Sequence, residues 1–167
     1  MEPLTGTDRR HVDAAEGWLG LGDLQEARAE LAALSPDLAD HPEVLEVRWH
    51  LHAAAKEWEP AAAVATKICE ALPENVFGYV HHAYALHELK RTQEARSVLL
   101  PARAKFPRDY IVPYNLACYA CQLGDLDQAW TWLSQARSLA GTVLIYKMAL
   151  ADSDLEPLWG RIRDETA

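Results

Sequence analysis

One feature of the sequence restricts the fold more than any other, a step of 34 residues at which similar side chains return. Alanine recurs at this step, at positions 27, 61, 95 and 129. A second series holds leucine or alanine, at Leu31, Ala65, Leu99 and Leu133. A fixed period of this length predicts one packing interface copied along the chain, and therefore stacked structural units instead of one central core.

The last copy shows what each unit contains. Residues 113–123 and 126–136 each carry an apolar stripe at helical spacing. Between them, Gly124 can take the left-handed conformation that ends a helix, and Asp125 has a side chain that caps the next one. Alanines in both stripes allow close approach, so the stretch predicts a hairpin of two antiparallel helices.

A 34-residue period with a helix–turn–helix in each copy resembles the tetratricopeptide repeat (TPR) family. The resemblance covers residues 8–143 as four repeats, 8–41, 42–75, 76–109 and 110–143. It implies an all-α fold, a right-handed superhelical solenoid of four helical hairpins. Residues 1–7 are expected to form a disordered lead. Residues 144–167 are expected to form C-terminal capping helices. The last of these helices is expected over 155–163, with Leu155, Leu158, Trp159 and Ile162 facing the stack. The segment 151–158 is similar to a tail common after the last repeat in bacterial TPR proteins.

Three positions depart from the family pattern. Trp49 stands where the pattern has a small residue, and the facing run Ala61–Ala65 is small enough to compensate in volume. The third repeat has no glycine in its turn, so Lys90, Arg91 and Thr92 must form it, with Thr92 as the expected cap. Pro101 falls inside a predicted helix and is expected to kink it.

Composition narrows the classes of partner and compartment. The net charge is −9, which argues against a nucleic-acid or anionic-membrane surface. A basic partner is the kind that this charge favours electrostatically, but acidic balance is common in soluble proteins, and we interpret it as a feature of solubility alone. Cys69, Cys118 and Cys121 are an odd number with no framework spacing, which indicates a reducing compartment. With no signal-peptide run and no membrane-length apolar window, we expect a cytoplasmic protein. A homodimer stays an open alternative.

Motifs for catalysis and metal binding are scarce in this sequence. It has no glycine-rich phosphate loop and no nucleophile elbow, so we expect neither enzyme activity nor a cofactor. His50, His81 and His87, together with Cys118, are candidate ligands for a transition metal. They lack a closed ligand spacing, and we interpret the histidines as neutral side chains of a binding groove, with no metal.

The resemblance implies that the first helix of each repeat lines a concave groove that binds peptides. The 34-residue step places aromatic and histidine side chains on that face in repeats three and four, and acidic ones in repeat one. The predicted partner-binding residues are His50, Val80, His81, Tyr84, His87, Tyr114, Asn115, Cys118 and Gln122. The family's clamp for a C-terminal carboxylate is not expected, because the matching positions hold no lysine or arginine.

The function that this pattern favours is a protein–protein interaction scaffold or adaptor, which binds a peptide or helix of a partner in the groove. Two alternatives stay open. One is a secretion-type chaperone that shields a translocator segment. The other is a non-catalytic or metal-binding subunit of an enzyme complex.

Overall fold

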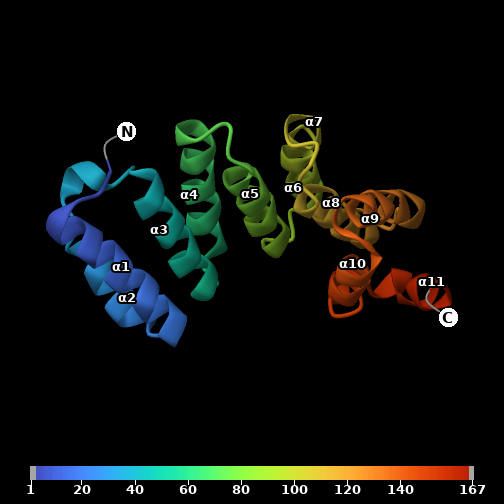
Figure 1. The fold of residues 1–167 in the computed structure, drawn as a ribbon, viewed down its shortest axis with the longest axis horizontal. Helices are drawn as coiled ribbons and strands as arrows, with labels where there is room; N and C mark the ends of the chain where they lie inside the picture. The colour runs from blue at the N-terminus through green and yellow to red at the C-terminus, as the bar shows by residue number, and fades with distance from the viewer. Residues whose placement is uncertain (1–2, 166–167) are drawn as a thin grey trace. The chain divides into compact units, whose positions relative to one another are not determined.

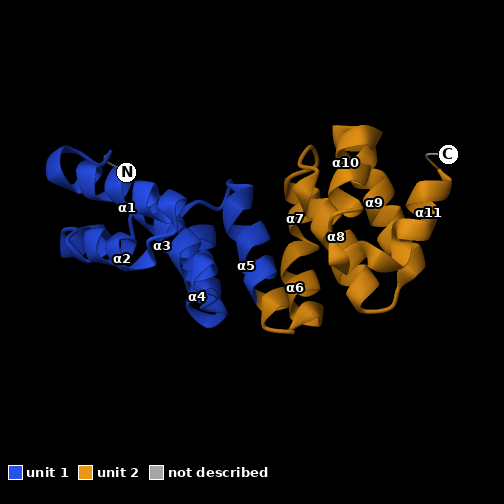
Figure 2. Cartoon of the chain, turned by 90° about the horizontal axis from the view of Figure 1, so that it is seen from below, with its two compact units in different colours: residues 1–85 blue, residues 86–167 orange. Residues whose placement is uncertain are grey.

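The computed structural model describes residues 3–165, and within that range the regular elements are all helices. The chain divides into two compact units, residues 1–85 and 86–167, called here the N-terminal and C-terminal units (Figure 2). The boundary falls inside helix α5 (Val76–Glu88), within the predicted third repeat.

The N-terminal unit consists of two helical hairpins and most of α5 (Figure 1). Its elements are α1 (Gly6–Leu21), α2 (Leu24–Ala32), the short 3-10 helix η1 (Pro36–Leu38), α3 (Pro42–Ala54) and α4 (Trp58–Ala71). Helix α1 packs against α2, and α3 packs against α4. Helix α1 also contacts α3, so the first helices of the two hairpins are neighbours.

The core of this unit confirms the predicted balance of large and small side chains. Trp49 is buried in one apolar cluster with Ala61 and Ala65, which are both fully buried. Helix α5 approaches α4 closely at Gly78, where an added Cβ would lie 2.8 Å from the backbone nitrogen of Cys69. A side chain at this position would therefore push the two helices apart.

The C-terminal unit is built around helix α8. Its elements are α6 (Thr92–Leu99), α7 (Ala102–Lys105), α8 (Ile111–Gln122), α9 (Leu126–Ala140), α10 (Thr142–Ala149), the 3-10 helix η2 (Ser153–Leu158) and α11 (Trp159–Asp164). Helices α8 and α9 form the predicted hairpin, with Gly124 left-handed at φ 82° and Asp125 accepting a hydrogen bond from the Gln128 amide at 3.1 Å. The sequence interpretation of this turn is confirmed.

The third repeat shows one confirmed expectation and one error. The predicted helix is interrupted at Pro101, which separates α6 from α7. Lys90 takes the left-handed position of the turn, with φ 64°. Thr92 is not the cap, because the helix begins at Thr92 and its N-cap is Arg91, which makes no side-chain capping bond.

Both ends of the chain differ from the sequence expectation. In the expected lead of residues 1–7, Leu4 is buried in the core and α1 already begins at Gly6, while residues 1–2 lie outside the described range. The expected helix over 155–163 is instead η2 followed by α11. Its side chains nevertheless face inward as predicted, since Leu155, Leu158 and Ile162 are buried.

Candidate functional site

The predicted partner-binding residues are distributed over both units. His50, Val80, His81 and Tyr84 belong to the N-terminal unit, on α3 and α5. The other five residues belong to the C-terminal unit: His87, Tyr114, Asn115, Cys118 and Gln122. The predicted groove residues therefore fall into two separate sets, one in each unit.

In the N-terminal unit, three of the four residues meet in a cluster of rings. His81 stacks on Phe77, with ring centroids 3.7 Å apart and an interplanar angle of 24°. Trp49 meets the His81 ring edge-on at 4.1 Å. His50 packs edge-on against Phe77 at 5.6 Å, and Tyr84 packs edge-on against Trp49 at 6.4 Å. Val80 is buried on α5, the helix that carries three of these rings.

The sequence prediction left Trp49 and Trp58 out of this surface. Trp49 was assigned to hairpin packing alone, yet its ring contacts both histidines of the set. Trp58, the first residue of α4, meets the Tyr84 ring edge-on at 5.6 Å. The groove prediction followed the 34-residue step along the first helices alone, so it did not include Trp58, which begins a second helix.

The histidines of the ring cluster are held neutral. Burial lowers the pKa of His81 to about 4, and its Nδ1–H donates to the Phe77 carbonyl at 2.8 Å. Desolvation also lowers the pKa of His50, against the opposing effect of the Glu16 charge. At neutral pH the surface is therefore aromatic and uncharged, with Tyr84 38% exposed at its edge.

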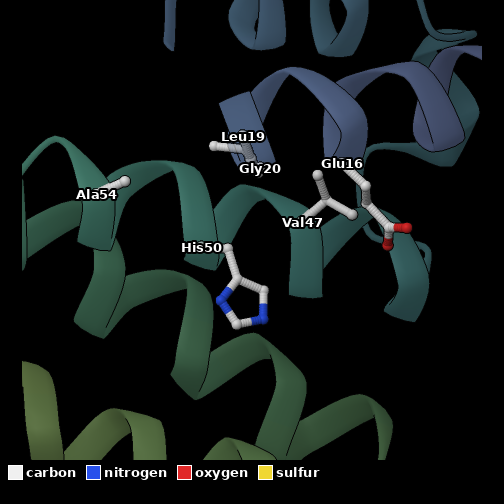
Figure 3. Close-up of a pocket in the computed structure, with 6 residues that line it drawn as sticks. All are labelled: Glu16, Leu19, Gly20, Val47, His50 and Ala54. Atoms are coloured by element: carbon white, nitrogen blue, oxygen red, sulfur yellow. The ribbon is translucent and has the colours of Figure 1, made fainter. Parts of the chain in front are cut away.

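An open pocket of about 470 Å³ adjoins this surface, between α1 and α3 (Figure 3). Its lining is mainly apolar, with two polar side chains, Glu16 from α1 and His50 from α3. Val47 lies between these two in the view of Figure 3. The full lining is Glu16, Leu19, Gly20, Val47, His50 and Ala54. His50 thus belongs to both the pocket and the ring cluster.

The edge of this pocket is acidic. Burial raises the pKa of Glu46, and the negative charges of Glu43 and Glu16 raise it further. Arg9 forms an ion pair with Glu43 at 2.6 Å. Within residues 3–165, no Lys, Arg or His forms an ion pair with Glu16 or Glu46. In that range the two carboxylates near the pocket are thus left without a cation.

In the C-terminal unit, the predicted residues contact the segment that follows α10. The Tyr114 hydroxyl donates to Asp152 Oδ2 at 2.9 Å, and the Cys118 thiol approaches the same oxygen at 3.5 Å. Gln122 Nε2 donates to the Asp154 carbonyl at 3.1 Å. Asn115 differs from its neighbours on α8, because it is only partly buried.

His87 completes this contact from the end of α5. Its Nε2 lies 3.0 Å from Asp154 Oδ2, and its Nδ1 lies 2.9 Å from the Thr92 hydroxyl. An imidazole that donates from Nε2 and accepts at Nδ1 satisfies both contacts. Residues 152–154 are therefore bound by side chains from the end of α5 and from α8, all within the C-terminal unit.

This arrangement changes the interpretation of the C-terminal set. The prediction placed Tyr114 in an open groove, but its side chain is only 6% exposed, and Cys118 and His87 are buried as well. Burial raises the pKa of Tyr114 and of Cys118, and the Asp152 charge adds to both shifts. The physical reason for the difference is that Asp152 supplies the hydroxyl's acceptor from within the chain.

The candidate metal ligands do not assemble into a recognisable site. Among residues 3–165, no group of three or more His, Cys, Asp or Glu side chains is placed to hold a metal ion. His50 and His81 lie near each other, with ring centroids 6.1 Å apart. Cys121, the second cysteine of the C-x-x-C pair, is also buried, and burial raises its pKa to about 11.

Comparison with known proteins identifies the class of fold. No family model and no curated protein matches the chain. Solved structures do match. A thermophilic TPR protein of Thermus thermophilus has a TM-score of 0.73 at 20% identity, over 93% of this chain and 82% of that one. MamA of Desulfovibrio magneticus RS-1 has a TM-score of 0.72 at 16% identity, over 97% and 96% of the two chains.

A further MamA structure, from MSR-1, matches with a TM-score of 0.67 at 21% identity, over 77% of this chain and 74% of that one. The class is thus that of all-helical repeat proteins. Within it, the chain has the TPR-type fold that the 34-residue step predicted. In residues 3–165, no helix combines the length and the apolar character needed to cross a membrane.

Proposed function

We propose that this protein is an interaction scaffold whose N-terminal unit binds a segment of a partner protein across α3 and α5. The observation that carries the proposal is the ring cluster around Trp49, which exposes Tyr84 and shares His50 with an open pocket. Aromatic side chains supply large contact areas at low entropic cost and often dominate binding energy. The TPR-type fold supports a role in protein–protein interaction in general.

The proposed site is narrower than the sequence predicted. It keeps His50, Val80, His81 and Tyr84. His87, Tyr114 and Cys118 are used within the C-terminal unit and are assigned to holding the segment 152–154. The proposed role is non-catalytic. Desolvation is the main cause of the lowered pKa values of His81 and His50.

The division into four repeats stays a proposal, and the burial pattern supports it. The alanines at positions 27, 61, 95 and 129 are all 0% exposed. A cytoplasmic location is likewise proposed, since Cys69, Cys118 and Cys121 are all free thiols.

A photo-crosslinking amino acid placed at Tyr84 tests the proposal in cells. We expect reproducible adducts with one partner protein, and none from the same group at Glu70, an exposed position on α4. Tyr84→Ala should then weaken binding of the purified partner about tenfold or more, with little change in thermal unfolding. Adducts at Glu70 but not at Tyr84 would remove the α3–α5 surface from consideration.

The identity of the crosslinked protein also decides among the functions left open by the sequence. A crosslinked translocator component would favour the secretion-type chaperone. A crosslinked enzyme subunit would favour a role as a subunit of an enzyme complex.

A further inference from the structure

We infer that the pocket between α1 and α3 is a subsite for a lysine or arginine side chain of the partner segment. This inference rests on the proposed function and adds the chemical class of the partner. The N-terminal unit would then bind partner segments in which a basic residue stands next to an apolar or aromatic residue.

The shape of the pocket suits a long side chain with an apolar stem. Its volume of about 470 Å³ lies in the range typical of ligand pockets. Leu19, Val47 and Ala54 supply apolar walls, and the pocket opens to solvent at the surface of the unit. Lys and Arg bury their methylene stems along such walls while the charged head stays near water or a counter-ion.

The charge of the pocket selects a cation. Glu16 is the charged side chain of the lining, and an ionised carboxylate can only accept hydrogen bonds. Glu46 lies close enough for the Glu16 charge to raise its pKa. A bound ammonium or guanidinium would supply the donors that both carboxylates lack within the described residues.

The neighbouring groups do not offset this negative charge. His50 is neutral at pH 7 because desolvation lowers its pKa. The nearby Arg9 is engaged by Glu43 at 2.6 Å and by Asp13 at 3.7 Å. A ligand carboxylate would therefore meet repulsion in this pocket, and the net charge of −9 adds long-range attraction for basic segments.

His50 connects the pocket to the ring cluster, because it lines one and packs in the other. A segment whose basic side chain enters the pocket would place its next residues near Phe77 and Trp49. Apolar or aromatic neighbours of the basic residue fit that surface, and acidic neighbours do not.

Three acetylated and amidated tripeptides provide the probes: Leu-Lys-Leu, Leu-norleucine-Leu and Leu-Glu-Leu. Each is titrated into the full chain while methyl NMR signals of Leu19, Val47 and Ala54 are followed. We expect saturable shifts with the lysine peptide, binding at least about threefold weaker with norleucine, and no saturable shift with glutamate. Added salt should weaken binding of the lysine peptide more than binding of the other two peptides.

Matched variants assign the effect to the pocket. Glu16→Gln should weaken the lysine peptide about threefold to tenfold and leave the norleucine peptide unchanged. Glu70→Gln, which changes the net charge equally but lies on α4, should change neither. Glu16 is exposed, so the fold should survive, and the unfolding midpoint verifies this. Glu46→Gln gives a second, independent removal of charge.

Equal binding of the three peptides, an equal effect of Glu70→Gln, or the absence of saturable shifts at the three methyl positions would overturn the inference. The outcomes also separate it from the proposed function. Crosslinks at Tyr84 without a preference for the lysine peptide would support the partner-binding surface and refute the basic subsite. A preference for the lysine peptide without crosslinks at Tyr84 would support a cation-binding pocket and refute the partner-binding role.

Discussion

The same repeat position behaves differently in the two units. In the N-terminal unit, Glu16 and His50 are one 34-residue step apart, and they line an open pocket. In the C-terminal unit, Cys118 and Asp152 are also one step apart and are equivalent to that pair. There the thiol lies 3.5 Å from the carboxylate, and the Tyr114 hydroxyl donates to the same oxygen.

The difference arises from where the following helix ends. Helix α3 continues past His50 to Ala54, and the open pocket lies between side chains of α3 and α1. Helix α10 ends at Ala149, and the chain turns at Asp152 into η2, which packs on α8. One repeat surface can therefore be left open for a partner or be covered by the chain itself.

Removing residues 152–167 should have the largest effect of the changes considered, because it uncovers the α8 surface that the chain itself covers. The deletion uncovers the surfaces buried by Leu155, Leu158 and Ile162, each worth about 1.5–3 kcal/mol of burial. We expect a large loss of stability in the C-terminal unit and aggregation, measured by thermal unfolding and light scattering.

The Cys118 thiol provides the control for this deletion. It should react slowly with a thiol reagent in the full chain, where it is buried, and quickly after the deletion. A truncated chain that stays monomeric, with an unchanged midpoint and a protected thiol, would show that η2 and α11 do not cover α8 in solution.

The sequence could predict what depends on local pattern. The 34-residue step identified the buried alanines, and Gly124 and Asp125 identified the turn. Pro101 identified the interruption between α6 and α7. Each of these outcomes depends on residues within one hairpin, so spacing and backbone preference were sufficient.

The sequence could not predict which parts of the groove face are open. An amphipathic tyrosine suits a partner-binding surface and also a buried site with a hydroxyl acceptor, and the acceptor of Tyr114 lies 38 residues away at Asp152. The expected helix over 155–163 contains Pro157, and its first part forms η2 instead. The prediction of Thr92 as the N-cap was wrong. Lys90 takes the left-handed position of the turn, and the helix already begins at Thr92.

Overpacking the hairpins should have the next largest effect and compares the two units directly. Ala61 and Ala129 are equivalent and fully buried, but Ala61 packs in a cluster with Trp49, whereas the C-terminal unit holds Ala117 at the matching position. Ala61→Leu and Ala129→Leu should each cost roughly 1–3 kcal/mol of unfolding free energy, with Ala61→Leu the more costly.

Urea unfolding measures both variants, and Ala63→Leu is the control because Ala63 is exposed on the same helix as Ala61. The packing assignment fails if Ala63→Leu costs as much as Ala61→Leu.

Acid should weaken the ring cluster of the N-terminal unit. Burial lowers the folded-state pKa of His81 to about 4, below the unfolded value of about 6.5. Between these two pKa values the unfolded chain binds the proton more readily than the folded chain. The contribution of neutral His81 to the free energy of unfolding is therefore complete above about pH 6.5 and falls as the pH drops toward 4. We expect a loss of roughly 2 kcal/mol in unfolding free energy between pH 7 and about pH 4.5.

His81→Asn isolates this contribution, because carboxylates elsewhere in the chain titrate in both proteins. The dependence of unfolding free energy on pH should be shallower in the variant across this range. Identical slopes in the two proteins would mean that His81 is as solvated in the folded chain as in the unfolded one.

The smallest expected effect compares one tyrosine from each unit. Tyr114→Phe removes the hydroxyl that donates to Asp152 Oδ2, and should cost about 1 kcal/mol because the carboxylate loses a donor in a buried setting. Asp152 keeps its bond from the Asp154 amide at 3.0 Å, so the turn into η2 should persist. Tyr84→Phe, at a side chain that is 38% exposed, should change stability by less than about 0.5 kcal/mol. Chemical unfolding of both variants measures the difference, and proton exchange of the η2 amides should quicken in Tyr114→Phe alone. If the two substitutions cost the same, the Tyr114 hydroxyl does not hold the C-terminal segment, and the α8 surface is closer to the open α3 surface than the hydrogen bonds indicate.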